Sequence, residues 1–364
     1  MTHALVTGST GFIGRQLVKH LVDRGDRVTC LVRSTSNRRV VDSAKVDFVT
    51  GDVTDFDSVS KAVHDVDVVY HLAAVTKAFR RSTFLDVNQS GVDNVARACG
   101  DRGGNTTLVL VSSLAAAGPS RLGRPLTESD IPHPVSTYGI TKLAGEIIAR
   151  RYAGHVPTTI VRPPIVMGEG DADGFAMFQS IARTGLHFSP GLADTEVSMI
   201  DVMDLVRALT LVAEKGKRMG SHGNDASAGV YFAAADEVVT YGELGRMIGR
   251  AVGRDNAIVA HMPKAVVWGI AGISDLAGRI RRRPNILNWD KAREATAGSW
   301  TCSAANLMGD TGFAQAMPMA TRIRQTAEWY FANNWLPMPR KARQRGPVGL
   351  EQIRNASTKT LRDT

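Results

Sequence analysis

Short apolar runs rich in β-branched residues alternate with segments of helical periodicity along the first 165 residues of the chain. The apolar runs predict strands at Ala4–Thr7, Arg27–Val32, Val46–Thr50, Val66–Leu72, Thr107–Ser112 and Thr158–Arg162. The periodic segments predict helices at Ile13–Arg24, Ser58–Val63, Val87–Ala98 and Thr137–Arg151. Beyond residue 165 the pattern is looser and predicts helices at Phe175–Thr184 and Met199–Glu214 and a strand at Val230–Ala233. This alternation is typical of an α/β fold with a doubly wound parallel sheet.

The change of pattern divides the chain. We expect residues 1–165 to form the first domain and residues 199–233 to return to it. Residues 166–198 and 234–336 are expected to form a smaller, mainly helical domain that binds the substrate. Residues 337–364 are polar and basic and are expected to form a mobile tail.

A glycine-rich turn joins the first predicted strand to the first predicted helix. Gly8, Gly11 and Gly14 recur at every third position within Thr7–Gly14. Glycines in a strand–turn–helix allow backbone N–H groups to approach a pyrophosphate at the helix N-terminus. The turn therefore predicts a dinucleotide-binding, Rossmann-type domain.

Tyr138 and Lys142 lie four residues apart in a predicted helix, so their side chains share a face. A nearby ammonium lowers the pKa of a phenol, which is ordinarily about 10. The pair therefore predicts a tyrosine that transfers protons near neutral pH. Ser113 follows the fifth predicted strand, and residues that follow parallel strands lie at one edge of the sheet, where ligands bind.

The chain resembles the extended short-chain dehydrogenases/reductases, which include nucleotide-sugar epimerases and dehydratases, 3β-hydroxysteroid dehydrogenases and dihydroflavonol reductases. The resemblance runs from residue 2 to about residue 336. It rests on motifs in the family's order: Thr7–Gly14, Gly51–Val53, His71–Ala74, Asn88, Ser112–Ser113, Tyr138–Lys142 and Arg162–Gly168.

The resemblance implies a catalytic triad of Ser113, Tyr138 and Lys142. Ser113, the second serine of the pair, would hydrogen-bond the substrate carbonyl oxygen. Tyr138 would protonate the developing alkoxide, or deprotonate an alcohol in the reverse direction. Lys142 would tune Tyr138 and bind the nicotinamide ribose. His71 is expected to serve structure.

The resemblance also implies the cofactor contacts. Asp52 and the Val53 N–H would meet the adenine, and Asn88 would steady the adjoining strand and the cofactor. The full set is Gly8, Thr10, Gly11, Phe12, Ile13, Gly14, Arg33, Asp52, Val53, Leu72, Ala73, Ala74, Asn88, Tyr138, Lys142, Pro163 and Val166. No metal site is expected.

Arg33 decides the predicted cofactor. Folds that prefer NAD usually place an acidic residue after the second strand, where it binds the adenosine 2′-hydroxyl. Here Arg33 stands at that place, Arg38 and Arg39 follow, and no carboxylate is near. A guanidinium suits a 2′-phosphate, so we expect NADP, with NAD as the alternative.

Departures from the family's motifs narrow the reaction. Leu114-Ala115 replaces the acidic pair of sugar 4,6-dehydratases. Sugar epimerases usually carry an asparagine after the sixth strand and an arginine before the segment Ser198–Asp201, and these places here hold Arg162-Pro163-Pro164 and Glu196-Val197. Trp300–Ser303, Thr311–Phe313 and Ala327–Tyr330 resemble the 3β-hydroxysteroid dehydrogenase and dihydroflavonol reductase branch. We predict an NADP-dependent oxidoreductase that interconverts a ketone and a secondary alcohol on a mid-sized, largely apolar substrate. A steroid-, flavonoid- or β-keto-lipid-like molecule would fit. A nucleotide-sugar epimerase with bound NAD and a non-catalytic NADP(H)-binding scaffold remain alternatives.

The composition and charge of the chain limit which partners it can bind. The net charge is +9, with basic clusters at Arg279–Arg283 and Arg340–Arg345, but neither has the interleaved aromatic residues of a nucleic-acid site. These basic residues are typical of a solvated surface. Alternatively, because Arg279–Arg283 follows the apolar stretch Met262–Ala277, residues 262–283 form a peripheral membrane contact. No signal peptide or spanning segment is apparent, and we expect a cytoplasmic protein. The resemblance implies a homodimer through Val87–Ala98 and Thr137–Arg151.

Overall fold

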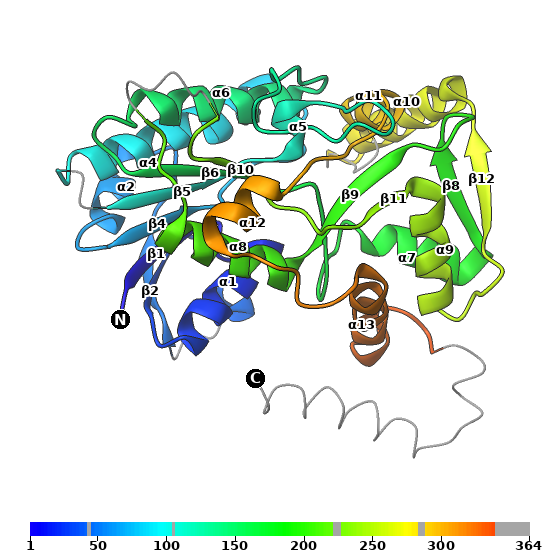
Figure 1. Cartoon of the computed structure of the whole chain (residues 1–364), viewed down its shortest axis with the longest axis horizontal. Helices are drawn as coiled ribbons and strands as arrows, with labels where there is room; N and C mark the ends of the chain where they lie inside the picture. The colour runs from blue at the N-terminus through cyan, green and yellow to red at the C-terminus, as the bar shows by residue number, and fades with distance from the viewer. Residues whose placement is uncertain (42–44, 104–105, 221–226, 283–287, 339–364) are drawn as a thin grey trace, which may run out of the picture.

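The computed structural model describes residues 1–41, 45–103, 106–220, 227–282 and 288–338 (Figure 1). The predicted tail lies outside the described residues from residue 339 on, as do Arg283 and the basic cluster Arg340–Arg345.

A parallel sheet forms the larger part of the fold. Within the described residues it has seven strands in the order β10-β6-β5-β4-β1-β2-β3, and every neighbouring pair is parallel. Their bounds are β1 His3–Thr7, β2 Arg27–Val32, β3 Asp47–Thr50, β4 Val68–His71, β5 Thr107–Val111, β6 Thr158–Arg162 and β10 Val230–Phe232. The predicted doubly wound sheet is confirmed, and two strands have the predicted bounds.

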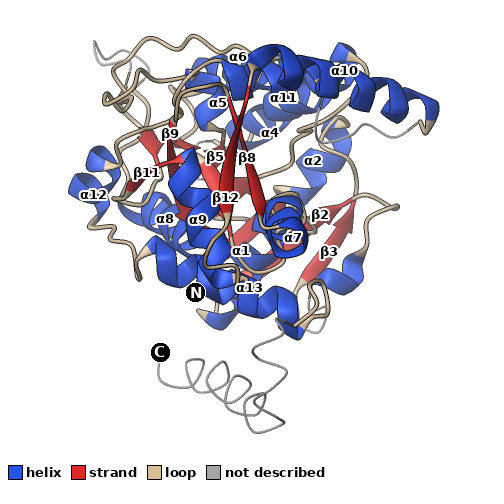
Figure 2. Ribbon diagram, turned by 90° about the vertical axis from the view of Figure 1, so that its right-hand side faces the viewer, coloured by secondary structure: helices blue, strands red, loops and turns tan. Residues whose placement is uncertain are grey.

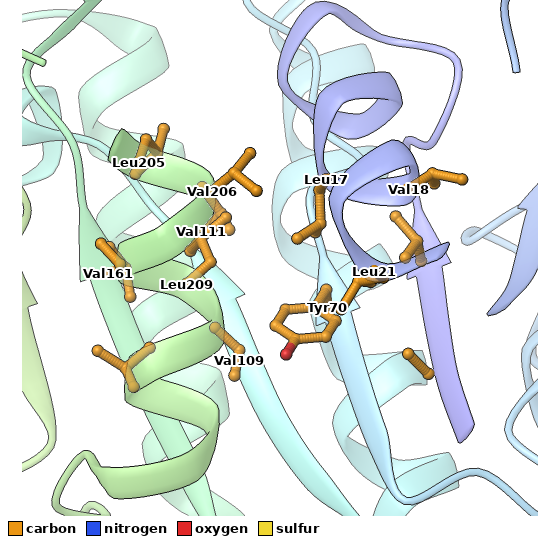
Figure 3. Close-up of a cluster of buried hydrophobic side chains, with 14 of the residues drawn as sticks. Leu17, Val18, Leu21, Tyr70, Val109, Val111, Val161, Leu205, Val206 and Leu209 are labelled. Atoms are coloured by element: carbon orange, nitrogen blue, oxygen red, sulfur yellow. The ribbon is translucent and has the colours of Figure 1, made fainter. Parts of the chain in front are cut away.

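Helices cover both faces of this sheet (Figure 1). On one face, α1 (Phe12–Asp23) and α8 (Val202–Lys215) contribute Leu17 and Leu209 to a core that also contains Tyr70 of β4 (Figure 3). On the other face lie α2 (Phe56–Ala62), α4 (Gly91–Gly100) and α6 (Thr137–Arg151). Burial of these apolar side chains from water holds the layers together.

Several helix boundaries differ from the prediction, most clearly where α8 and α4 begin. Residues Met199–Asp201, predicted as helix, end the strand β9 (Glu196–Asp201). Helix α8 begins only at Val202, because the Asp201 carboxylate accepts a hydrogen bond from the Met203 amide at 2.9 Å and caps it. Ahead of α4, helix α3 (Arg81–Leu85) and a π-helical turn at Asp86–Ser90 extend the helix predicted to begin at Val87.

The smaller part of the fold contains two short sheets and several helices (Figure 2). Strands β7 (Ile165–Met167), β9 and β11 (Val238–Thr240) form one sheet, and β8 (Leu186–Pro190) pairs with β12 (Ile258–Met262). The helices are α7 Phe175–Thr184, α9 Tyr241–Ala251, α10 Lys264–Ile280, α11 Trp289–Thr296 and α13 Met319–Ala332. Two short helical turns, at Arg38–Val40 and Leu114–Ala117 (α5), lie in the larger part.

One segment that we expected in the substrate domain lies against the larger sheet instead. Helix α12 (Ala305–Thr311) packs on α8 and β10. Leu307 and Phe313 are buried in the same core as Leu17 and Leu209. After the smaller part, the chain therefore returns to the face of the larger sheet that α1 and α8 cover.

A substitution at Gly14 tests how closely helix α1 approaches the glycine turn. A Cβ atom at Gly14 would lie 2.1 Å from the carbonyl oxygen of Gly8, a contact with backbone that no side chain can relieve. We expect Gly14→Ala to lower the free energy of unfolding by about 1–3 kcal/mol, the usual cost of overpacking.

The matched control is Gly269→Ala, since Gly269 is also inside a helix and nothing lies within 4 Å of a Cβ atom there. Alanine is the better helix former, so this variant should be neutral or slightly stabilised. Denaturant unfolding of both variants measures the difference, and equal stabilities would contradict the close approach.

Candidate active site

The glycine turn brings the ends of β1 and β4 together. Gly8 has a φ of +70°, and a Cβ atom there would lie 2.8 Å from the Ala73 amide nitrogen. The Thr7 hydroxyl accepts a hydrogen bond from that amide at 3.2 Å and bonds the His71 ring at 2.8 Å. Helix α1 begins just beyond, and the first N–H groups of a helix lack partners inside it. The turn, with Thr10, Gly11, Phe12 and Ile13, fits a pyrophosphate.

His71 is excluded as an acid or base near neutral pH. Burial, together with the charge of Lys142, lowers the pKa of His71 to about 3. The ring therefore stays neutral and bonded to Thr7, in agreement with the structural role that we expected.

The two serines after β5 have different partners. The Ser112 hydroxyl donates to the buried carboxylate of Glu146. The Ser113 hydroxyl accepts a hydrogen bond from the Ala115 amide at 3.1 Å and caps α5. Ser113 also lies close enough to the Tyr138 side chain to affect its pKa. Ser112 thus belongs to the core, whereas Ser113 adjoins Tyr138.

The electrostatics of Tyr138 differ from the sequence prediction. Burial raises the pKa of Tyr138 to about 12, the hydrogen bond from Ser113 opposes this rise, and the charge of Glu294 adds to it. The predicted lowering of this pKa by Lys142 is therefore wrong for the protein without a ligand. The phenol stays protonated at neutral pH and is ready to donate its proton.

Lys142 is held at the carboxyl end of β5. Its ammonium donates to the Val111 carbonyl at 2.7 Å, and only 5% of the residue is exposed. Burial lowers the pKa of Lys142 to about 8, and the carboxylate of Glu146 opposes this shift. The side chain is therefore charged below about pH 8.

Residues from α11 complete the surroundings of Tyr138. The Asp290 carboxylate accepts from the Tyr138 amide at 3.4 Å, and Glu294 accepts from the Ser136 hydroxyl at 2.6 Å. The Lys291 ammonium lies 5.8 Å from the centre of the Tyr138 ring. These residues lie about 150 positions beyond Tyr138 in the sequence, and no motif marks them.

A cleft opens beside the N-terminus of α6. Aromatic rings supply much of its apolar wall, and Thr137 and Asp290 join it to the catalytic helix. It is lined by Ala78, Phe79, Arg81, Phe84, Thr137, Asp275, Arg279, Asn288, Trp289 and Asp290. A larger hollow at Gly100, Val156 and Arg218 lies at the amino ends of the strands, on the opposite edge of the sheet. The smaller cleft is therefore the one that adjoins the candidate chemistry.

The predicted adenosine contacts lie at the ends of β2 and β3. Arg33 is exposed, and its amide donates to the Ser36 hydroxyl at 3.2 Å. The Arg38 guanidinium donates to the Thr50 hydroxyl at 2.7 Å, so a second cation lies over the same edge. The Asp52 carboxylate accepts from the amide and the hydroxyl of Thr54, both at 2.9 Å.

The other predicted cofactor contacts follow the remaining strands of the sheet. Asn88 accepts from the Val75 amide at 2.8 Å and donates to the Val75 carbonyl at 3.0 Å, so it clamps the loop that carries Leu72, Ala73 and Ala74. The neighbouring positions are Val53, buried after β3, Pro163, buried after β6, and Val166, half-buried in β7. Within the described chain, no three His, Cys, Asp or Glu residues are grouped as a metal site.

Comparisons with known proteins agree with this fold. The model of the NAD dependent epimerase/dehydratase family matches residues 4–226. A ceramide reductase of Caulobacter vibrioides is 29% identical over 333 residues, which cover 91% of this chain and 95% of that protein. A 3 beta-hydroxysteroid dehydrogenase/Delta 5-->4-isomerase of Mycobacterium tuberculosis is 27% identical over 74% of each chain.

Solved structures extend the likeness to the whole fold. The dTDP-glucose 4,6-dehydratase of Bacillus anthracis, solved with NAD, superposes with a TM-score of 0.72 at 18% identity and covers 92% of this chain and 98% of that one. The UDP-glucose 4-epimerase of Thermotoga maritima, solved with UDP-glucose, has a TM-score of 0.70 at 20% identity, with 91% and 99% covered.

Proposed function

The chain belongs to the NAD dependent epimerase/dehydratase family, and it is thus an NAD(P)-dependent enzyme of the extended short-chain dehydrogenase/reductase type. We propose the following reaction for it. It interconverts a ketone and a secondary alcohol on a mid-sized, largely apolar substrate with NADP. The observation that carries this proposal is the placement of three side chains: Ser113 caps α5 and acts on Tyr138, and Lys142 lies one turn beyond Tyr138 on α6, buried against the Val111 carbonyl.

The chain's own groups have separate tasks in this reaction. A bound nicotinamide supplies or accepts the hydride. The Ser113 hydroxyl donates a hydrogen bond to the substrate oxygen and stabilises negative charge that develops there. Tyr138, protonated at neutral pH, gives its phenolic proton to the same oxygen. The Lys142 ammonium stabilises the phenolate that remains, since an opposite charge nearby favours the ionised form.

The cleft supports an apolar substrate. Phe79 and Trp289 line it and are 39% and 44% exposed, so their rings offer apolar surface to a ring system or an acyl chain beside a polar part of the wall. Two relatives are named for reactions on ceramide and on a 3 beta-hydroxysteroid. A steroid-, flavonoid- or β-keto-lipid-like ketone fits both observations.

Two alternatives follow from the same fold. A nucleotide-sugar epimerase would oxidise and re-reduce a sugar carbon with tightly bound NAD, and a scaffold would bind NADP(H) without turnover. Leu114 and Ala115 are buried where a sugar dehydratase carries acids, and Pro163 is buried where an epimerase carries asparagine. Co-purified NAD would favour the epimerase, and turnover of an apolar ketone with NADPH would exclude the scaffold.

Tyr138→Phe tests the proton donor. The variant loses the phenolic hydroxyl while it keeps the ring, so we expect turnover of an apolar ketone to fall by about 10²–10⁴-fold, the usual range for general acid catalysis. NADPH affinity should stay within a few-fold. Initial rates of NADPH oxidation and a fluorescence titration measure the two quantities.

The serine pair supplies a control for this experiment. Ser113→Ala should also lose turnover, whereas Ser112→Ala should lose stability, because it leaves Glu146 without one partner. Normal turnover by the Tyr138→Phe protein would remove Tyr138 from the mechanism.

Arg33→Asp tests the choice of cofactor. A carboxylate repels a 2′-phosphate and accepts hydrogen bonds from a 2′-hydroxyl, so the ratio of NADPH to NADH affinity should fall about tenfold or more. Side-by-side titration of tryptophan-to-nicotinamide fluorescence measures both affinities. Lys61→Asp, at an exposed cation on α2, controls for the change in net charge. Unchanged preference in the Arg33 variant would refute the 2′-phosphate contact.

We also propose a homodimer through α4 and α6. Ile140 and Ile147 lie seven residues apart on α6 and are 43% and 49% exposed, so they form one apolar line on its outer face. Ile147→Glu should convert the dimer to a monomer, since it would bury an unpaired charge. Light scattering measures the mass, and Ile258→Glu, at a 62% exposed position on β12, is the control. A native protein that is already monomeric would contradict the proposal.

A further inference from the structure

Helix α10 presents an apolar face to solvent. Its exposed side chains are 41% to 75% accessible and are spaced three or four residues apart, so they fall on one side of the helix. They are Val266, Ile270, Ile273, Leu276 and Ile280, which we call the α10 face. Contiguous apolar surface of this kind marks an interaction site, whereas single exposed residues do not.

The opposite side of α10 is already used by the fold. Val267 and Ala271 are buried with Ala292 of α11, and the ring of Trp268 lies 5.7 Å from that of Trp289. Because α11 also contacts Tyr138, the packed pair of α10 and α11 connects the α10 face to the candidate active site.

Positive charge flanks the α10 face at both ends. Lys264 begins the helix, and Arg281 and Arg282 follow its last residue; all three are exposed. The helix carries a single acid, Asp275, whose carboxylate is paired with the Arg279 guanidinium at 2.7 Å. An apolar stripe between cations complements an anionic lipid surface, in which acyl chains lie beneath phosphate groups.

The cleft opens at the border of this face. Asp275 and Arg279 line the cleft, while their sequence neighbours Leu276 and Ile280 belong to the α10 face. Phe79, 39% exposed, lines the cleft as well, and the Arg279 guanidinium lies 5.9 Å from its ring centre. A molecule that leaves a lipid layer along α10 would therefore meet the cleft first.

We propose that the α10 face rests on an anionic membrane and that the apolar substrate enters the cleft from the lipid. The second half of the proposal rests on the proposed function. In the described part of the chain, no helix is long and apolar enough to cross a membrane, and α10 has 17 residues. The contact is therefore peripheral, with the helix lying along the interface.

Co-sedimentation with vesicles tests the contact. The full chain should bind vesicles of phosphatidylglycerol and phosphatidylcholine more tightly than vesicles of phosphatidylcholine alone. Ile273→Glu should weaken this binding about tenfold or more, since it puts a charge where an apolar side chain would enter the lipid. Arg281→Glu should remove the preference for the anionic lipid. Ile258→Glu, at the far end of β12, should bind as the native protein does.

Three other results of this experiment would overturn the membrane contact. Native protein that stays in solution, or an Ile273→Glu variant that binds normally, would overturn the proposal. If Ile273→Glu instead lowers the mass in solution without vesicles, a second copy of the chain covers the face, and the membrane contact is wrong.

Entry from the lipid is tested separately from turnover. With a vesicle-borne ketone, Ile273→Glu should raise KM and leave kcat unchanged, whereas a water-soluble ketone should show neither change. An unchanged KM with the vesicle-borne ketone would overturn entry from the lipid. Tyr138→Phe should bind vesicles normally, because the variant changes only the proton donor. Native protein that binds vesicles but reduces neither ketone would refute the proposed function and leave the membrane contact standing.

Discussion

A buried ion pair between Glu146 and Arg162 underlies the arrangement of the candidate active site. The two side chains are 2% and 4% exposed, and two hydrogen bonds of 2.6 and 2.9 Å join them. The pair ties α6 to the end of β6, and Ser112 ties it to the end of β5. Removing one partner of such a pair leaves an uncompensated buried charge, at a cost of about 3–5 kcal/mol. The position of α6 therefore depends on this contact.

The same pair sets the electrostatics of the catalytic helix. Lys142 lies one turn before Glu146 on α6, and the carboxylate partly offsets the burial that lowers the pKa of Lys142 to about 8. The charge of Lys142 in turn adds to the burial that keeps His71 neutral. A single carboxylate in the core thus helps to hold one positive charge, that of Lys142, at the carboxyl edge of the sheet. The remaining groups there, Ser113 and Tyr138, are hydroxyls that supply hydrogen bonds and a proton.

The α10–α11 hairpin links this chemistry to the surroundings of the molecule. Its inner helix places Asp290 and Glu294 against the start of α6, and its outer helix exposes the α10 face. The cleft lies between them and the loop that carries Phe79. One small element therefore closes the site over Tyr138, forms part of the substrate wall and presents an apolar surface beside the entrance.

Local sequence was sufficient to predict the strands of the larger parallel sheet in their chain order, whereas the two short sheets of the smaller part were not predicted. Thr137–Arg151 and Phe175–Thr184 are helices with the predicted bounds, and Arg27–Val32 and Thr158–Arg162 are strands with the predicted bounds. Periodicity is a property of neighbouring residues, so no distant contact is needed to detect it. The motifs likewise predicted that Gly8, Asp52 and Ser113 lie at one sheet edge, because parallel strands share that edge.

Only the tertiary structure decided the environments of these residues. The spacing of Tyr138 and Lys142 predicted a lowered phenol pKa, but burial raises it to about 12, and burial depends on segments distant in the sequence. The strand at Glu196–Asp201 forms because β7 and β11 pair with it, which overrides the helical pattern of its last residues. Asp290 and Glu294 carry no motif at all, since only the packing of α11 on α6 brings them to Tyr138. The sequence determined which groups the site contains, and folding determined what surrounds them, because desolvation and charge act through space.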